Sequence, residues 1–177
     1  DFMNVEYRQD NNPELMGEAR KRFADEIGQL RSFGFAEYCC YTELLPNYSA
    51  ITGIVTYLLA KLNREIIRIE PHLRIAMSQP ILIHRERGAY ALVFGLGVKF
   101  YTLFTDGTGL ITANFPSQPI QDMRLKLYKF AEASSIADGW QAHLTETANL
   151  QKMGRQVDEQ IDFEDYVQIS KREENAA

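Results

Sequence analysis

The chain has 177 residues, of which 45% are hydrophobic and 24% are charged, and this composition is typical of a folded globular domain rather than of a disordered segment. Its formal net charge is -5 at pH 7, which argues against a nucleic-acid-binding protein that uses a broad basic face. The longest mainly apolar stretch, residues 50–62, is too short to cross a bilayer, which takes about 20 residues.

The first predicted elements are a helix and a strand. Residues 13–33 have the pattern of an amphipathic helix, with Asn12 as its cap, Pro13 in its first turn and Gly34 at its end. Its apolar residues recur at helical spacing: Met16, Ala19, Phe23, Ile27 and Leu30. The aromatic-rich segment 35–45 then predicts a β-strand.

A second helical pattern opens at Ser49. Its apolar stripe consists of Ile51, Ile54, Val55, Leu58, Leu59 and Leu62. The pattern continues through Ile66 and Ile69 and must stop near Pro71, although residues 66–77 also suit short strands. We interpret the stripe as core packing; the alternative is a face for a partner or for a second copy of the chain.

A β-meander is predicted next. Its strands are expected at 80–84, 89–94, 98–105 and 109–115, with turns at 85–88, 95–97 and 106–107. A two-residue turn at Asp106-Gly107 would place Thr105 opposite Thr108. A four-residue loop keeps the same faces. A three-residue loop would place Phe100 and Phe104 opposite polar positions, so we reject it. Asp106 is therefore interpreted as a turn residue.

The C-terminal part of the chain is expected to be helical. A helix is predicted at 120–133. Ser135 and Asp138 resemble a capping box with Asp in place of Glu, and they open a helix that ends near Gly154. The acidic tail, 154–177, has an apolar patch that predicts a last short helix: Phe163, Tyr166 and Val167.

These elements predict an α+β fold, an antiparallel β-meander sheet with helices packed on one face. Residues 1–177 are expected to form a single domain, with 1–12 as an N-terminal extension.

Few residues are placed for acid–base chemistry. His84 ends a predicted strand beside Glu86, and His143 lies one helical turn from Trp140. The candidates for a catalytic acid or base are His84, Glu86 and His143.

Metal and nucleotide sites are not predicted. The histidines lack HxH or HExxH spacing, and Cys39 and Cys40 are adjacent rather than spaced as CxxC. We expect the two cysteines to be reduced. The turn Gly95-Leu96-Gly97 lies between strands and no helix opens after it, so it predicts no dinucleotide cofactor.

Aromatic residues on the predicted strands and the helix after Ser135 suggest a ligand pocket. The candidates for ligand binding are Tyr38, Tyr41, Tyr90, Tyr101 and Trp140. The alternative is that these side chains belong to the core and rim of the sheet.

The function hypothesis is a non-catalytic module that binds a small molecule or a protein partner. Because the sequence starts at Asp1 rather than Met, the module is also considered as the soluble part of a longer, membrane-anchored protein. The alternatives are a small enzyme with a His/Glu acid–base site and a subunit of a homo- or hetero-oligomer. The reduced cysteines favour the cytoplasm, or the cytoplasmic side of a membrane.

Overall fold

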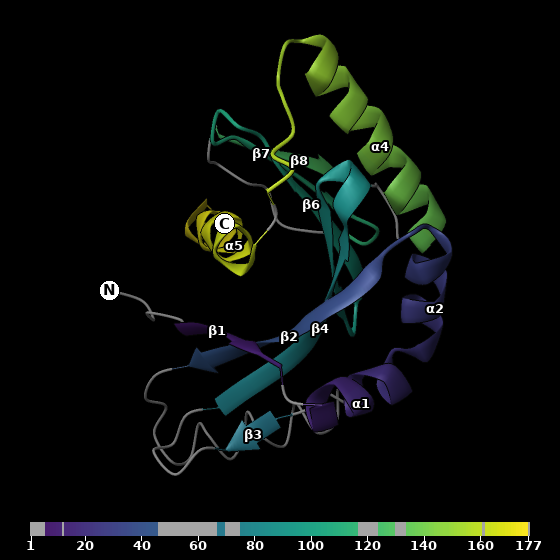
Figure 1. The fold of residues 1–177 in the computed structure, drawn as a ribbon, viewed down its shortest axis with the longest axis vertical. Coiled ribbons are helices and arrows are strands. Elements are labelled where there is room, and N and C mark those ends of the chain that lie inside the picture. Colours follow the sequence, from purple (N-terminus) through teal and green to yellow (C-terminus); the bar gives the residue numbers. More distant parts are fainter. Residues whose placement is uncertain are drawn as a thin grey trace. The chain divides into compact units, whose positions relative to one another are not determined.

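The computed structural model describes residues 6–11, 13–45, 67–69, 75–116, 124–129, 134–160 and 162–176 (Figure 1). The chain divides into two compact units. The small unit comprises residues 1–22 and 39–80, and the large unit comprises residues 23–38 and 81–177. The single-domain interpretation of the chain stays a prediction.

The secondary structure confirms the α+β class. The helices are α1 (Pro13–Arg22), α2 (Ala24–Ser32), the short 3-10 helix η1 (Arg85–Arg87), α4 (Ile136–Lys152) and α5 (Phe163–Ala176). The strands are β1 (Glu6–Asp10), β2 (Ala36–Leu45), β3 (Ile67–Ile69), β4 (Ile75–His84), β5 (Ala89–Phe94), β6 (Gly97–Leu103), β7 (Gly109–Ala113) and β8 (Leu125–Lys129). The pairing is antiparallel from β4 through β7, as the predicted meander requires.

The small unit contains a strand that the sequence analysis missed. β1 lies within the predicted N-terminal extension and pairs antiparallel with β2, from Glu6 opposite Leu44 to Asp10 opposite Cys40. Its sequence, EYRQD, has one aromatic and four polar residues, and a strand of that composition gives no apolar alternation to detect. β3 pairs with β4, so residues 66–77, which suited either helix or strands, contain strands.

α1 packs in the small unit through a short apolar row. Leu15 and Ala19 are buried together with Cys40 of β2, and the Cys40 Sγ atom lies 3.1 Å from the Met16 Sδ atom. Cys39 and Cys40 are both buried, and neither is part of a disulfide. Asn12 and the predicted helix at 49–69, except for β3, lie outside the described residues, so the partner-face hypothesis for its stripe stays a prediction.

The predicted helix at 13–33 is two helices. The backbone leaves helical geometry at Phe23, with φ -116° and ψ 36°, and α2 begins at the next residue. Phe23, Ile27 and Leu30 are nevertheless buried in the large unit, as their spacing predicted. The spacing of apolar residues indicates which of them face a core, and a one-residue break in the helix hardly changes that spacing.

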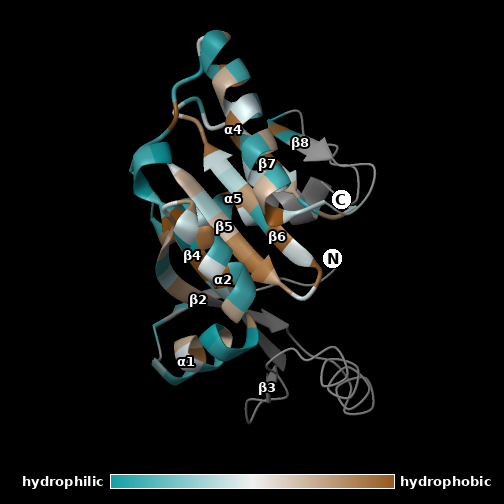
Figure 2. Ribbon diagram, turned by 90° about the vertical axis from the view of Figure 1, so that its right-hand side faces the viewer, coloured by the Kyte–Doolittle hydropathy of each residue, from teal (hydrophilic) through white to brown (hydrophobic). Residues whose placement is uncertain are grey.

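The large unit is built around β5, which is buried along most of its length. β5 pairs with β4 on one side and with β6 on the other. Figure 2 colours its C-terminal half as hydrophobic, and Leu92 and Val93 there are 7% and 0% exposed. The prediction of an inner strand at 89–94 is confirmed.

The hairpin between β6 and β7 has the register that the sequence analysis rejected. Phe100 lies opposite Thr112 and Thr102 opposite Leu110, so Thr105, Asp106 and Gly107 form a three-residue loop. Gly107 has φ 75°, and its N–H donates to the Phe104 carbonyl, as in a type I turn closed by a left-handed glycine. The rejection was wrong because it counted Thr112, opposite Phe100, as a polar position unsuited to the core, whereas Thr112 is fully buried.

Asp106 has the turn role that was predicted for it. Its Oδ1 atom accepts a hydrogen bond from the Thr108 N–H at 2.9 Å. Hydrogen bonds from the Thr108 hydroxyl group and, second, from the Thr108 N–H lower the pKa of the exposed Asp106 carboxyl, because they stabilise the charged form.

The helix predicted at 120–133 is wrong, because β8 runs through its centre. Residues 125–129 pair parallel with β7, from Gly109 opposite Leu125 to Ala113 opposite Lys129. The sequence LKLYK begins with an alternation of apolar and charged residues, Leu125-Lys126-Leu127; Leu125 is buried and Lys126 is exposed. A period of two fits this short segment at least as well as a helical period, and the edge of β7 supplies hydrogen-bond partners.

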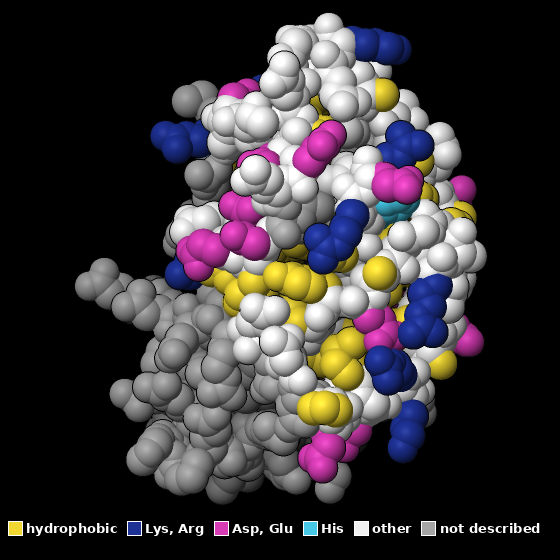
Figure 3. Space-filling model, in the orientation of Figure 1, with side chains coloured by type: hydrophobic (Ala, Val, Ile, Leu, Met, Phe, Trp, Pro, Cys, Tyr) yellow, Lys and Arg dark blue, Asp and Glu magenta, His cyan; other side chains and the backbone are white. Residues whose placement is uncertain are grey.

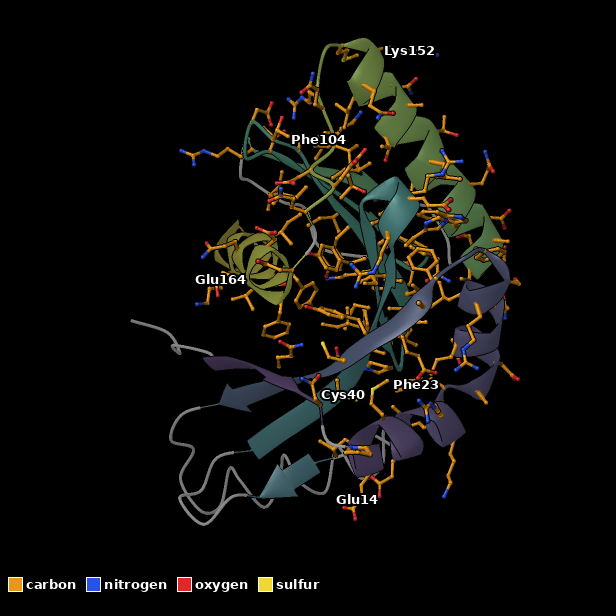
Figure 4. All side chains as sticks on the ribbon, viewed as in Figure 1. Glu14, Phe23, Cys40, Phe104, Lys152 and Glu164 are labelled. Atoms are coloured by element: carbon orange, nitrogen blue, oxygen red, sulfur yellow. The ribbon has the colours of Figure 1, made fainter. Side chains whose placement is uncertain are left out.

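Helices pack on both faces of the sheet in the large unit (Figure 1). α4 and α2 contact each other, and they cover one face of β5, β6 and β7, which confirms the predicted helix packing. α5 contacts β6 from the other face, where Tyr101 meets Tyr166. Figure 4 shows side chains filling the space between α5 and the strands.

Charge is distributed without a broad basic surface on the face shown in Figure 3. Lys and Arg side chains are interspersed with Asp and Glu there, and acidic side chains gather over α5, whose first turn contains Glu164 and Asp165. Among the described residues, no helix combines the length and the apolar character that crossing a membrane requires.

Candidate functional site

α4 positions the side chains of the site. The helix begins at a capping box, in which the Ser135 Oγ atom accepts from the Asp138 N–H at 3.0 Å and the Asp138 carboxylate accepts from the Ser135 N–H. This confirms the cap predicted from the sequence. The helix then places Trp140, His143 and Thr147 on its buried side, at spacings of three and four residues.

His143 joins the helix to two strands. Its Nε2 atom lies 2.9 Å from the Thr102 Oγ1 atom of β6, and its Nδ1 atom lies 2.9 Å from the Thr112 Oγ1 atom of β7. All three side chains are buried, with exposed fractions of 1% or less. Each threonine hydroxyl therefore has a hydrogen-bond partner inside the protein, as buried polar groups require.

The imidazole of His143 is neutral near pH 7. Complete burial lowers its pKa from 6.5 to about 3, because no carboxylate compensates for the lost hydration of a charged ring. A neutral imidazole has one N–H donor and one acceptor nitrogen. One of the two threonines therefore donates its hydroxyl proton to the ring, and the other accepts the proton of the ring.

A pocket of about 190 Å³ opens beside this histidine. We call it the α4 pocket. It is lined by Glu86, Arg87, Ala89, Thr102, Trp140, His143, Leu144, Thr147, Ala148, Gln151, Val157 and Glu159. The interior holds the buried residues Thr102, Trp140 and His143, whereas the charged residues are exposed at the rim.

An aromatic cluster supports the Trp140 side of the α4 pocket. The Trp140 ring packs edge-on against Phe35 at a centroid distance of 4.8 Å, and Phe100 lies 5.3 Å away. The His84 ring stacks on Trp140 at 5.8 Å, with an interplanar angle of 26°. Burial and the positive charge of Arg87 lower the pKa of His84, so this ring also favours the neutral form.

The structure brings two of the three predicted acid–base residues to one pocket. Glu86 of η1 and His143 of α4 both line the α4 pocket, although they are far apart in the sequence. His84 is not among the lining residues and lies behind Trp140 in the aromatic cluster. Both ring nitrogens of His143 are bonded to threonine hydroxyls, so neither is left for Glu86.

The predicted aromatic site is divided between the two faces of the sheet. Trp140 lines the α4 pocket. Tyr90 and Tyr101 are buried on the opposite face, where both rings contact Tyr166 of α5. The Tyr90 hydroxyl donates to the Asp162 carbonyl, and burial raises its pKa, so it is a neutral core group.

The two remaining tyrosines lie on β2. Tyr38 is half-buried in the large unit, near enough to Tyr90 to raise the pKa of its hydroxyl slightly. Tyr41 belongs to the small unit, where its backbone lies opposite Gln9. Their role as ligand-binding residues stays a prediction.

Sequence reasoning missed the threonines of the site. Thr102 and Thr112 were placed on opposite faces of the sheet by the predicted hairpin register, whereas the observed register places them on the same face. Thr147 follows His143 by four residues, and on a predicted helix this spacing places the two side chains on the same face. Val157 and Glu159 come from the irregular segment after α4, which has no regular apolar period.

Comparison of the chain with protein-family models, with curated proteins and with solved structures finds no match. Among the residues that the structure describes, no group of three or more His, Cys, Asp or Glu side chains is placed to hold a metal ion.

The burial of His84 and His143 predicts an acid-sensitive fold. Both rings have pKa values below 6.5 when folded, so the unfolded chain binds protons more readily. We expect the free energy of unfolding not to depend on these two groups above pH 6.5. It should fall as the pH drops toward 3, by up to about 1.4 kcal/mol per pH unit for His143, and the lowered pKa of His84 acts in the same direction. Urea unfolding followed by the fluorescence of Trp140, the single tryptophan, measures it.

A comparison variant isolates the contribution of His143 to this pH dependence of stability. In the bridge-free variant, Thr102→Val, Thr112→Val and His143→Leu are combined. The free energy of unfolding of the wild type should fall relative to that of this variant as the pH drops below 6.5. A difference that does not change with pH would contradict the neutral, buried state of His143.

Proposed function

We propose that the large unit is a non-catalytic binding module for a small organic molecule, with the α4 pocket as its site. The observation that carries the proposal is the composition of the pocket: an apolar and neutral polar interior, with charged residues only at the rim. Small-molecule sites have this composition, in which a few polar groups fix the ligand and apolar walls exclude water.

The size of the α4 pocket limits the ligand. Its volume of about 190 Å³ is below the roughly 300–1,000 Å³ of pockets for drug-sized ligands. The walls contribute Trp140, Leu144 and Val157 as apolar contacts. A molecule with a single ring, or a short branched chain, matches this space.

An enzyme that uses Glu86 and His143 is the second candidate, because both residues line the α4 pocket. General acid–base catalysis works best when the pKa of the catalytic group is near the working pH. The pKa of His143 is about 3, and both of its nitrogens are bonded to threonine. These facts favour a binding role over a proton-transfer role.

Binding of three compounds of similar size tests the proposal: benzamide, benzylamine and benzoate. Line broadening in the ligand NMR spectrum and a change in Trp140 fluorescence report contact with the α4 pocket. The variant Ala148→Phe places a ring in the pocket from an exposed helix position. We expect at least one compound to bind the wild type, and Ala148→Phe to weaken that binding by about tenfold or more.

The matched control is Ala137→Phe, at an exposed position of α4 outside the pocket lining. This variant should bind as the wild type does. Absence of binding for all three compounds, or binding that Ala148→Phe leaves unchanged, would refute the proposal.

A further inference from the structure

The interior of the α4 pocket carries no ionised side chain. Its buried lining residues are Ala89, Thr102, Trp140, His143 and Thr147, and the histidine is held between two hydroxyl groups rather than beside a carboxylate. A charged ligand group placed there would lose its hydration without gaining an opposite charge. Such a transfer is far more costly than the transfer of a neutral polar group that keeps its hydrogen bonds.

The charged residues of the rim do not offset the cost of burying a charged ligand group in the interior. Glu86, Arg87 and Glu159 are exposed, so water screens their fields. They are also of mixed sign, with two carboxylates and one guanidinium. The rim therefore selects neither cations nor anions for the interior.

Thr147 offers a hydrogen-bond acceptor to a ligand. Its Oγ1 atom donates its proton to the His143 carbonyl at 2.8 Å, one helical turn back. The hydroxyl oxygen keeps its capacity to accept a hydrogen bond, and Thr147 is among the residues that line the α4 pocket. An N–H or O–H group of a ligand can donate to it.

Thr102 offers either a donor or an acceptor, according to the tautomer of His143. If the Nε2 atom carries the ring proton, it donates to Thr102, and the Thr102 hydroxyl can donate to a ligand. If the Nδ1 atom carries the proton, Thr102 donates to the ring, and its oxygen accepts from a ligand. A ligand group with both a donor and an acceptor satisfies both cases.

We propose that the α4 pocket binds an uncharged molecule that places a primary amide or hydroxyl group against Thr102 and Thr147 and an apolar ring or chain against Trp140. This inference rests on the proposed binding function and adds the chemical class of the ligand. The neutral Thr102–His143–Thr112 bridge is thus part of the recognition surface as well as part of the core.

Four probes of matched shape test the inference: benzamide, acetophenone, benzylamine and benzoate. Benzamide is neutral with a donor and an acceptor, acetophenone lacks the N–H donors, and the other two are a cation and an anion at pH 7. We expect benzamide to bind about tenfold or more tightly than either charged probe, and about three- to tenfold more tightly than acetophenone.

The variant Thr147→Val removes the acceptor and keeps the side-chain shape. It should reduce benzamide affinity to that of acetophenone, whose affinity should stay unchanged. Thr145→Val is the control, because Thr145 makes the same backward hydrogen bond, to the Gln141 carbonyl, but is exposed outside the pocket. Thermal melting of both variants checks that each is folded.

The outcomes separate this inference from the proposed function. Tighter binding of benzylamine or benzoate, blocked by Ala148→Phe, would keep the binding function and overturn the neutral ligand class. Equal binding of benzamide and acetophenone would overturn the role of Thr147. Failure of every probe to bind would overturn the binding function itself.

Discussion

Replacing His143 by leucine is expected to lower the free energy of unfolding by about 2–5 kcal/mol, because two buried hydroxyl groups lose their partner at about 1–3 kcal/mol each. Thr102 and Thr112 would remain enclosed, since their exposed fractions are 1% and 0%. Urea unfolding near pH 7, followed by circular dichroism, measures the loss.

The bridge-free variant shows whether hydrogen bonding causes that loss. With Thr102→Val and Thr112→Val added to His143→Leu, no unpaired hydroxyl is left, and replacement of both partners by apolar groups of similar shape is close to neutral. We expect it to recover most of the stability that His143→Leu removes. Equal destabilisation of the single and the triple variant would assign the effect to packing around the ring instead.

This bridge explains why the hairpin register was mispredicted. Thr112 was counted as a polar position that should not lie opposite Phe100, so the observed register looked like a poor match of polar and apolar faces. The Thr112 hydroxyl group is satisfied by His143 of α4, 31 positions along the chain, whose Nδ1 atom lies 2.9 Å from the Thr112 Oγ1 atom. The residue pattern of the two strands does not reveal this partner, because the position of His143 depends on where α4 packs.

Elements with strong local signals were predictable. The capping box at Ser135 fixed the start of α4, and the spacing from Trp140 to His143 indicated its buried side. β8 has too few residues to distinguish a period of two from a helical period, and β1 has no apolar alternation. The α4 pocket combines η1, β5, β6, α4 and the segment after it, so its composition follows from tertiary packing.

Gly88 lies where the turn after η1 meets the segment that follows α4. Its backbone has φ 58°, a left-handed conformation that costs a residue with a side chain about 1–2 kcal/mol. An added Cβ atom would also lie 2.8 Å from the Asp158 carbonyl oxygen, and closer still to a methyl group of Val157. Asp158 is held in place, because its N–H donates to the Leu103 carbonyl at 3.0 Å. The backbone therefore cannot move away without breaking this contact with β6.

Gly88→Ala is accordingly expected to lower the free energy of unfolding by about 2–4 kcal/mol, the sum of backbone strain and overpacking. Gly107→Ala is the matched control: Gly107 also has a left-handed φ, 75°, but nothing lies within 4 Å of an added Cβ atom. It should cost only the strain, about 1–2 kcal/mol.

Because Val157 lines the α4 pocket, Gly88→Ala should also weaken benzamide binding, whereas Gly107→Ala should not. Equal losses of stability in the two variants would mean that the segment around Val157 yields to the new methyl group, and that this wall of the pocket is not fixed by Gly88.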